Sequence, residues 1–225
     1  MKVAVLFSGG KDSNMALKYA IENGWKVEAL IAVKPKNTEA YLWHFATVEW
    51  TILSSVAVGV PLFLIKCNTV GAEKEAKELE KVFKRIKVDA ILLGGVGLQK
   101  TQINEVTKVA KKFGINVIVP YHNYTSEKLL EEEVKSGFDI RITQVATDGL
   151  GPEWLGRKID MKAFEELKVL SKKFGFDILG EGGSYDSFVI DGPLYKSKIE
   201  LVKTSKNWNK DSGYLEVEDA KIIPK

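Results

Sequence analysis

The first 120 or so residues alternate between short apolar runs and longer segments whose apolar residues recur at helical spacing. The apolar runs, which predict buried strands, cover residues 2–7, 25–33, 61–66, 89–93 and 115–119. The segments between them, which predict helices, cover residues 12–23, 41–58, 72–86 and 101–113. Strands joined through helices favour an α/β fold, a parallel sheet with right-handed crossovers and helices on both faces. Ligands of such sheets bind beyond the carboxyl ends of the strands.

The pattern changes after His122. Helices are predicted over residues 126–136 and 160–174, with Ser126 and Asp160 as N-caps and Gly175 at the end of the second helix. Short strands are predicted over residues 139–147, 188–190, 198–206, 213–217 and 221–223. We therefore expect two units, residues 1–122 and a smaller α+β unit of residues 123–225, packed directly together around one cleft.

The charge and the cysteine content exclude several classes of protein. Thirty-three Lys and Arg residues against 30 Asp and Glu residues leave a formal charge of +3, which argues against strong nucleic-acid binding. No apolar run reaches the ~18 residues of a membrane span, and no signal peptide is recognisable, so we expect a cytoplasmic protein without membrane contact. Cys67 is the only cysteine, which excludes an internal disulfide and a paired-cysteine sulfur relay. A homodimer stays open.

A glycine turn, SGGKDS, follows the first predicted strand and opens the first predicted helix. Glycines let the backbone approach a ligand closely, and the free N–H groups at a helix N-terminus attract anions. The serines and the lysine add hydrogen bonds and a positive charge, while the aspartate is a candidate metal ligand or helix cap. The spacing differs from that of a P-loop. The turn predicts a phosphate site, against the alternative of a simple strand-to-helix turn, made by Ser8, Gly9, Gly10, Lys11, Asp12 and Ser13.

The same turn resembles the PP-loop of the N-type ATP pyrophosphatases. In that superfamily, whose sheet is Rossmann-like and of the HUP type, the loop holds the pyrophosphate part of ATP. The substrate attacks the α-phosphate, pyrophosphate leaves, and a nitrogen or sulfur nucleophile opens the adenylated intermediate. The lone Cys67 argues against the sulfur-transferring members, and we expect no room for a glutaminase domain in 225 residues. The resemblance thus implies a member that uses free ammonia or a small amine.

A second motif indicates one family within this superfamily. Residues 180–195 read GEGGSYDSFVIDGPLY and closely resemble the signature of the diphthine–ammonia ligases, approximately GEGGEYETFVLDGPLF. Residues 148–157 also resemble that family's stretch before its C-terminal helix, so the resemblance extends from Lys2 to about Ile199. It implies a ligase that uses ATP and Mg²⁺ to adenylate the carboxylate of diphthine on elongation factor 2. Ammonia then displaces AMP, which gives diphthamide.

The resemblance also implies roles for individual residues. Catalysis falls to Lys11, Asp12 and Glu181, and Mg²⁺ is held through Asp12 and the phosphates. ATP binding falls to the glycine turn together with His44, Gly94 and Gly95. Substrate binding falls to Gln99, Gly182, Gly183, Tyr185 and Asp186. Carboxylates and an aromatic ring suit ammonium or the trimethylammonium group of diphthine.

Each of these roles has a structural alternative. Glu181 and Asp186 would cap a turn or pair with lysines, and His44 would pack among aromatic residues at a helix end. The chain departs from the family at Lys100 and Gln102, where arginines are usual, and Lys lacks the bidentate geometry of Arg. Two other functions stay open: a PP-loop enzyme that acts on a tRNA or a small molecule, and an ATP-binding sensor without turnover.

Overall fold

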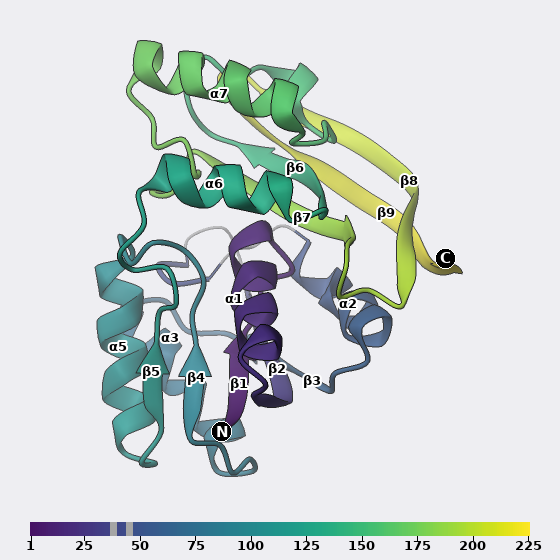
Figure 1. The fold of residues 1–225 in the computed structure, drawn as a ribbon. Coiled ribbons are helices and arrows are strands. Elements are labelled where there is room, and N and C mark those ends of the chain that lie inside the picture. Colours follow the sequence, from purple (N-terminus) through teal and green to yellow (C-terminus); the bar gives the residue numbers. More distant parts are fainter. Residues whose placement is uncertain (37–39, 44–46) are drawn as a thin grey trace.

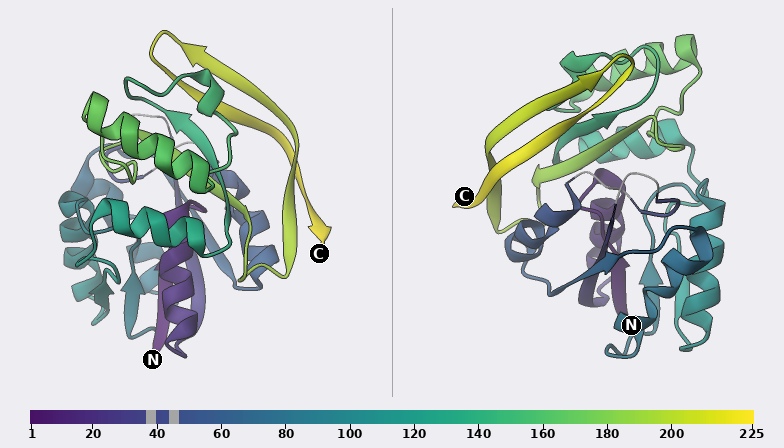
Figure 2. Two further views of the ribbon diagram at one scale, coloured as in Figure 1. Left: turned by 45° about the horizontal axis from the view of Figure 1, so that its top comes forward. Right: turned by 180° about the vertical axis from the view of Figure 1, so that it is seen from behind.

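Two β-sheets with their helices make up the computed structural model, which describes residues 1–36, 40–43 and 47–225. The parallel sheet and its helices are called the first unit here, and the antiparallel sheet and its helices the second unit. The second unit lies across the edge of the first sheet at which β1 (Lys2–Leu6) gives way to α1 (Lys11–Glu22) (Figure 1). The view from behind shows the same arrangement, with the N-terminus at the opposite edge (Figure 2). No helix among the described residues is long and apolar enough to cross a membrane.

The first sheet has five parallel strands in the order β3-β2-β1-β4-β5, which confirms the predicted α/β fold. Its other strands are β2 (Lys26–Pro35), β3 (Leu62–Cys67), β4 (Ala90–Leu92) and β5 (Asn116–Ile118). Val3, Ala4 and Val5 of the central strand are wholly buried, as expected of a parallel strand covered on both faces. The chain crosses from one side of β1 to the other between β3 and β4. The carboxyl ends of β1 and β4 therefore flank the crevice in which such sheets bind ligands.

Two layers of helices cover this sheet. The helices besides α1 are α2 (Thr51–Val58), α3 (Ala72–Lys77), α4 (Glu80–Phe83) and α5 (Lys100–Lys111). α1 and α2 share one apolar cluster with Val3 and Val5, whereas α3, α4 and α5 share the other with Ala4. Alternate residues of β1 thus face opposite layers. The single helix predicted over residues 72–86 is divided into α3 and α4.

Of the helix predicted over residues 41–58, residues 44–46 lie outside the described residues, and residues 41–43 and 47 are not helical. A 3₁₀ turn precedes α2, which begins only at Thr51. The backbone N–H of Leu42 donates to the carboxylate of Glu75 at 2.9 Å, so it is engaged by a side chain that lies 33 residues away in the chain. Thr47 adopts a left-handed backbone conformation with a φ of 62°. In the described residues, a long-range side-chain contact at Leu42 and a left-handed Thr47 stand where helix was expected.

The second unit confirms the predicted C-terminal α+β arrangement. Its antiparallel sheet has the strand order β7-β6-β9-β8. Its elements are α6 (Ser126–Lys135), β6 (Asp139–Val145), a 3₁₀ turn (Pro152–Trp154), α7 (Met161–Phe174), β7 (Tyr185–Asp191), β8 (Ser197–Asn209) and β9 (Ser212–Pro224). The short strands expected after residue 197 are instead two paired strands of 13 residues each, β8 and β9.

The caps of the second unit's helices agree with the sequence in one case and differ in the other. The Asp160 carboxylate accepts a hydrogen bond from the Ala163 N–H, and Gly175 ends α7 with a φ of 80°, so both predicted caps are confirmed. The N-cap of α6 is Thr125, not Ser126, because the Thr125 hydroxyl accepts a hydrogen bond from the Lys128 N–H at 3.2 Å; the Ser126 hydroxyl instead donates to Asp177 at 2.7 Å. That bond ties the start of α6 to the loop before β7.

The two units share one apolar core. Phe7 and Met15 of the first unit belong to the same buried cluster as Leu129 of α6 and Phe188 of β7. The glycine turn after β1 lies beside this cluster, so the second unit packs directly on it.

Candidate active site

Side chains in the first turn of α1 form hydrogen bonds with the glycine turn that precedes it. Gly10 is the N-cap of α1, and the Asn14 side chain donates to the carbonyl groups of Gly9 and Gly10 at 3.1 and 2.9 Å. The Ser13 hydroxyl also donates to the Gly10 carbonyl, at 2.9 Å. Because buried side chains take these carbonyl groups, the turn keeps a defined shape at the positive end of the helix dipole.

Strand β7 of the second unit also forms hydrogen bonds with this turn. The Val189 N–H donates to the Gly9 carbonyl at 2.9 Å, and the Lys11 N–H donates to the Ser187 hydroxyl at 3.2 Å. Gly9 has a φ of 81°, and a Cβ atom there would come within 2.6 Å of the Phe188 ring. A glycine is therefore required at this position, both for the backbone conformation and for the close packing of β7.

Lys11 is almost fully buried beneath the turn, with 2% of its surface exposed. Its ammonium lies 2.7 Å from Asp12 Oδ2 and 3.8 Å from Glu133 Oε2, and it sits over the ring of Tyr185. Burial alone would lower the pKa of Lys11, but the carboxylates of Asp12 and Glu133 outweigh it and raise that pKa. Lys11 therefore stays protonated and supplies a fixed positive charge.

Two carboxylates beside Lys11 have oxygen atoms without hydrogen-bond partners among the described residues. Glu133 on α6 is wholly buried, and neither of its oxygens has such a partner; the same holds for Oδ1 of Asp12. Burial raises the pKa of Glu133, and the Asp12 charge adds to this increase, while Lys11 opposes it. The site thus holds more acidic groups than its single buried cation balances.

The glycines after β4 let two other parts of the site approach closely. A Cβ atom on Gly94 would lie 2.5 Å from the backbone of Asp12, and one on Gly95 would lie 2.6 Å from the Glu181 carboxylate. Oε2 of Glu181 is buried without a hydrogen-bond partner in the described part of the chain. Burial raises the pKa of Glu181, with a further increase from the charge of Asp12. Gly94 and Gly95 therefore bring the β4 loop against both carboxylates.

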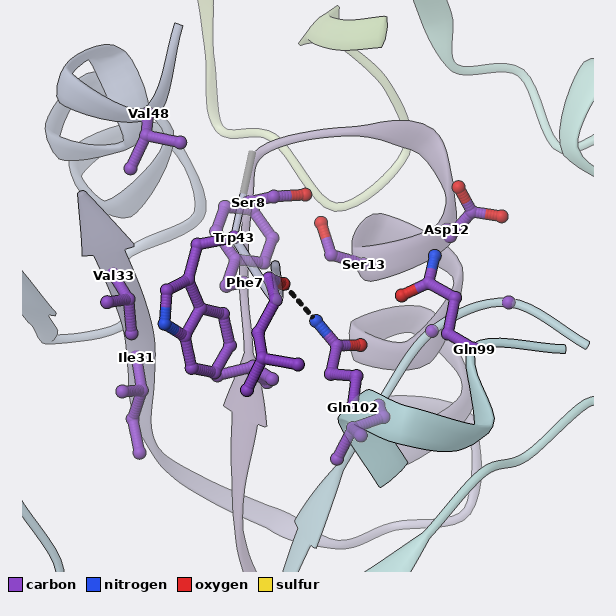
Figure 3. A pocket seen from close by; sticks show the side chains of 15 residues that line it. Phe7, Ser8, Asp12, Ser13, Ile31, Val33, Trp43, Val48, Gln99 and Gln102 are labelled. Carbon is purple, nitrogen blue, oxygen red and sulfur yellow. Dashed lines mark hydrogen bonds between the residues drawn. The ribbon is translucent and has the colours of Figure 1, made fainter. Parts of the chain in front are cut away.

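A pocket opens on the first-unit side of the glycine turn (Figure 3). Its walls combine apolar side chains of β2 and of Leu42, Trp43 and Val48 with polar side chains from the turn and from the start of α5. The lining residues are Leu6, Phe7, Ser8, Asp12, Ser13, Ile31, Val33, Leu42, Trp43, Val48, Leu93, Gly94, Gly95, Gln99 and Gln102. The mixture suits a ligand with a flat apolar part and polar edges.

A second pocket lies between the turn and the second unit. It is lined by Ser8, Gly10, Lys11, Asp12, Gln99, Leu179, Gly180, Glu181, Tyr185, Asp186 and Ser187. Ser8, Asp12 and Gln99 line both pockets, so the two spaces meet at the glycine turn. A ligand in the first pocket and another in the second would approach each other there.

The structure brings most of the sequence-predicted site residues together. Those that line one pocket or both are Ser8, Gly10, Lys11, Asp12, Ser13, Gly94, Gly95, Gln99, Glu181, Tyr185 and Asp186. Gly9 contributes its backbone to the turn without lining either pocket. Gly182 and Gly183 form a left-handed turn next to Glu181 and are not among the lining residues. His44 lies outside the described residues.

Sequence reasoning missed several residues of the site. Trp43 and Gln102 line the first pocket, Ser187 binds the turn, Glu133 faces Lys11, and Glu75 holds the segment before Trp43. For Glu133 a signal was present: it follows Leu129 by four residues and Leu130 by three, which places it on the buried face of α6. Because Glu133 is the last of three consecutive glutamates, the sequence suggests a solvent-exposed acidic stretch instead.

Two family models cover nearly the whole chain. Residues 1–117 match the model of the diphthamide synthase N-terminal domain, and residues 125–223 match that of the diphthamide synthase C-terminal domain.

Curated relatives agree with these matches. The chain is similar to the diphthine–ammonia ligase of Homo sapiens, with 30% identity over 222 residues, covering 88% of this chain and 82% of the human protein. It is also similar to the diphthine–ammonia ligase of Bos taurus, with 29% identity over 88% of this chain and 82% of the bovine protein. The similarity to the diphthine–ammonia ligase of Danio rerio is 28% over 96% of this chain and 92% of that protein.

Proposed function

Since this chain belongs to the diphthamide synthase family, we propose that it is an ATP-dependent ligase that amidates the carboxylate of diphthine on elongation factor 2. The enzyme first adenylates the carboxylate and releases pyrophosphate. Ammonia then displaces AMP, and the product is diphthamide.

One observation carries the proposal: the glycine turn lies where a partly apolar pocket and a second, more acidic pocket meet. We assign adenosine to the first pocket, because apolar side chains such as Ile31, Val33 and Trp43 form its walls. The phosphates lie along the turn at the N-terminus of α1, where backbone N–H groups and the helix dipole favour anions. The carboxylate to be activated then enters from the second pocket and reaches the α-phosphate beside the turn.

The bond changes balance without an oxidant or a reductant. A carboxylate oxygen attacks the α-phosphorus, the bond from phosphorus to the bridging oxygen breaks, and pyrophosphate leaves. The nitrogen of ammonia attacks the acyl carbon, the bond to the AMP oxygen breaks, and the nitrogen loses a proton. Lys11 stabilises the charge that develops on the phosphates, and Glu181 lines the pocket in which ammonia meets the adenylate.

The donors of the site fit Mg²⁺, which prefers oxygen ligands and keeps several waters when it binds phosphates. Oδ1 of Asp12 is a buried oxygen with no hydrogen-bond partner in the described part of the chain. No cluster of three or more His, Cys, Asp or Glu side chains among the described residues is arranged for a metal ion. Asp12 would therefore hold Mg²⁺ together with the phosphates of ATP, and the ion would neutralise phosphate charge.

The remaining roles follow the division of the chain that we propose at residue 122. Residues 1–122 bind ATP, with His44, Gly94 and Gly95 among the contacts. Residues 123–225 face the acceptor, through Tyr185, Asp186 and the turn at Gly182 and Gly183, while Gln99 reaches it from the first unit. Because the proposed acceptor lies on elongation factor 2, we expect the enzyme in the cytoplasm.

The test is to measure AMP and pyrophosphate with ATP, Mg²⁺, ammonium and elongation factor 2 that carries diphthine. The expected result is one AMP per amide formed, and no AMP when the factor lacks diphthine. If AMP forms with a tRNA or a small molecule but not with diphthine-bearing factor, the acceptor is wrong. If ATP binds and no AMP appears with any acceptor, the protein is a sensor and the ligase proposal fails.

A further inference from the structure

A buried carboxylate anchors one wall of the nucleotide pocket from outside it. Glu75 lies on α3, and none of its surface is exposed. Its two oxygens accept hydrogen bonds from the backbone N–H groups of Tyr41 and Leu42, at 3.0 and 2.9 Å, and from that of Gly71 at 3.0 Å. Glu75 itself lines neither pocket at the glycine turn.

A second side chain holds the same segment by its carbonyl group. The Gln102 amide, on α5, donates to the Leu42 carbonyl at 2.6 Å, and Figure 3 shows Gln102 beside the wall that carries Trp43. Both backbone groups of Leu42 are therefore bound by side chains from two different helices. The described residues 40–43 lie in neither a helix nor a strand, so these bonds take the place of secondary structure.

The segment held in this way forms part of the pocket. Leu42 and Trp43 both line the first pocket, and both are buried. The indole Nε1 of Trp43 is buried without a hydrogen-bond partner among the described residues. A ring and an N–H group thus stand at the pocket wall, on a segment whose position depends on Glu75 and Gln102.

We infer that Glu75 and Gln102 are positioning residues that clamp Leu42 so that Leu42 and Trp43 form the nucleoside-binding wall. The inference rests on the proposed function in one respect, the assignment of adenosine to this pocket. Loss of either clamp frees the segment, and ATP then has to order it on binding, which weakens the affinity. The chemical step takes place at the glycine turn and does not touch Glu75, so kcat at saturating ATP stays close to its original value.

The experiment measures the Kd of ATP by calorimetry in the absence of acceptor and ammonium. Three variants are compared with the native chain: Glu75→Gln, which keeps the volume but presents an amide N–H₂ to backbone donors, Gln102→Met, which removes the donor, and the two combined. Thr107→Ala on the exposed face of α5 is the control, since its hydroxyl only bonds to its own helix. Gln102→Lys retains a donor and serves as the conservative variant.

Each single variant is expected to raise the Kd of ATP about 10-fold, as for the loss of roughly one hydrogen bond to a charged or buried partner. The double variant should fall short of the 100-fold product, because both side chains act on Leu42. Thr107→Ala should bind ATP as the native chain does, and Gln102→Lys should recover most of the affinity. In steady-state assays the KM for ATP should rise while the KM for ammonium does not.

The outcomes separate this inference from the proposed function. If the native chain binds ATP and a folded Glu75→Gln variant binds it equally tightly, the clamp is overturned and the proposed function stands. If Glu75→Gln does not fold, the two variants at Gln102 provide the test. Equal affinities of Gln102→Met and Gln102→Lys for ATP would overturn the clamp. If Gln102→Met binds weakly and folded Glu75→Gln does not, Gln102 contacts ATP directly and the clamp is again wrong. If the native chain binds no ATP, both proposals fail.

Discussion

The Lys11 ammonium lies 3.8 Å from the Glu133 carboxylate, although the two residues come from different units. Lys11 begins the helix after the glycine turn, whereas Glu133 lies on α6 of the second unit. Both are buried, and Asp12 Oδ2 lies 2.7 Å from the same ammonium. A carboxylate of the second unit, that of Glu133, therefore partly balances the positive charge that Lys11 provides at the proposed phosphate site.

Glu133→Gln should make the protein more stable at neutral and alkaline pH. Burial and the charge of Asp12 raise the pKa of Glu133 in the folded state above its usual value near 4.5, even with Lys11 beside it. The folded protein then binds more protons than the unfolded chain, so stability falls as the pH rises from about 4.5 through the folded-state pKa. Each unit by which that pKa is raised costs about 1.4 kcal/mol of stability at higher pH.

Thermal unfolding between pH 4 and pH 9 measures this effect. The native chain should lose stability as the pH rises from about 4.5 towards the raised folded-state pKa of Glu133, and the variant should show a flatter profile. Glu132→Gln, in the same helix turn, is the control for the loss of one negative charge. A profile for Glu133→Gln that matches the native one would show that Glu133 is ionised and paired with Lys11 at no net cost.

Lys11→Met should lose both activity and stability, and the two losses can be separated. Removal of the ammonium takes away the buried cation shared by Asp12 and Glu133; the loss is smaller than the ~3–5 kcal/mol of a fully buried pair, because Asp12 is about one-third exposed and the raised pKa of Glu133 lets it take up a proton. The rate should fall about 100-fold or more, because the charge opposite the phosphates is lost. Combining Lys11→Met with Glu133→Gln should restore much of the stability without restoring AMP formation. Recovery of activity in the double variant would contradict a role for Lys11 in the reaction.

The first sheet could be predicted from the sequence because its strands are buried on both faces. Such strands are continuous apolar runs, as in Val3 to Val5, and no distant contact is needed to recognise them. The glycine turn and the motif around Glu181 were equally readable, since short turns between regular elements depend mainly on local residues. The structure places both motifs at one junction, which the topology of a parallel sheet makes an expected location.

Features that depend on long-range contacts could not be predicted in the same way. Leu42 and Trp43 lie in a stretch apolar enough for a helix, and side chains distant in the chain, Glu75 and Gln102, hold Leu42 in another conformation. The long strands β8 and β9 include many exposed polar residues, which interrupt the alternation of buried and exposed positions. The sequence therefore predicts shorter strands in this region. In each case the deciding partner lies elsewhere in the sequence.

Asp12→Ala should abolish turnover and leave the fold intact. The Asp12 side chain is about one-third exposed, at 33%, so its removal costs less than that of a buried ion. Lys11 keeps Glu133 as a partner, which holds its ammonium in place. AMP formation under saturating ATP and Mg²⁺ measures activity, and circular dichroism with thermal unfolding measures the fold. Full activity in this variant would remove Asp12, and with it the proposed Mg²⁺ contact, from the mechanism.

Gly9→Ala should disturb the packing of β7 against the glycine turn and so destabilise the protein. At a φ of 81° an alanine costs roughly 1–2 kcal/mol, and its Cβ would also lie 2.6 Å from the Phe188 ring, which adds an overpacking cost of about 1–3 kcal/mol. Gly24→Ala is a matched control, because Gly24 has a similar φ of 67° but no atom within 4 Å of the added Cβ. Urea unfolding should therefore show a larger loss for Gly9→Ala than for Gly24→Ala, and only Gly9→Ala should weaken ATP binding. Equal losses in the two variants would mean that β7 yields to the added methyl group without disturbing the turn.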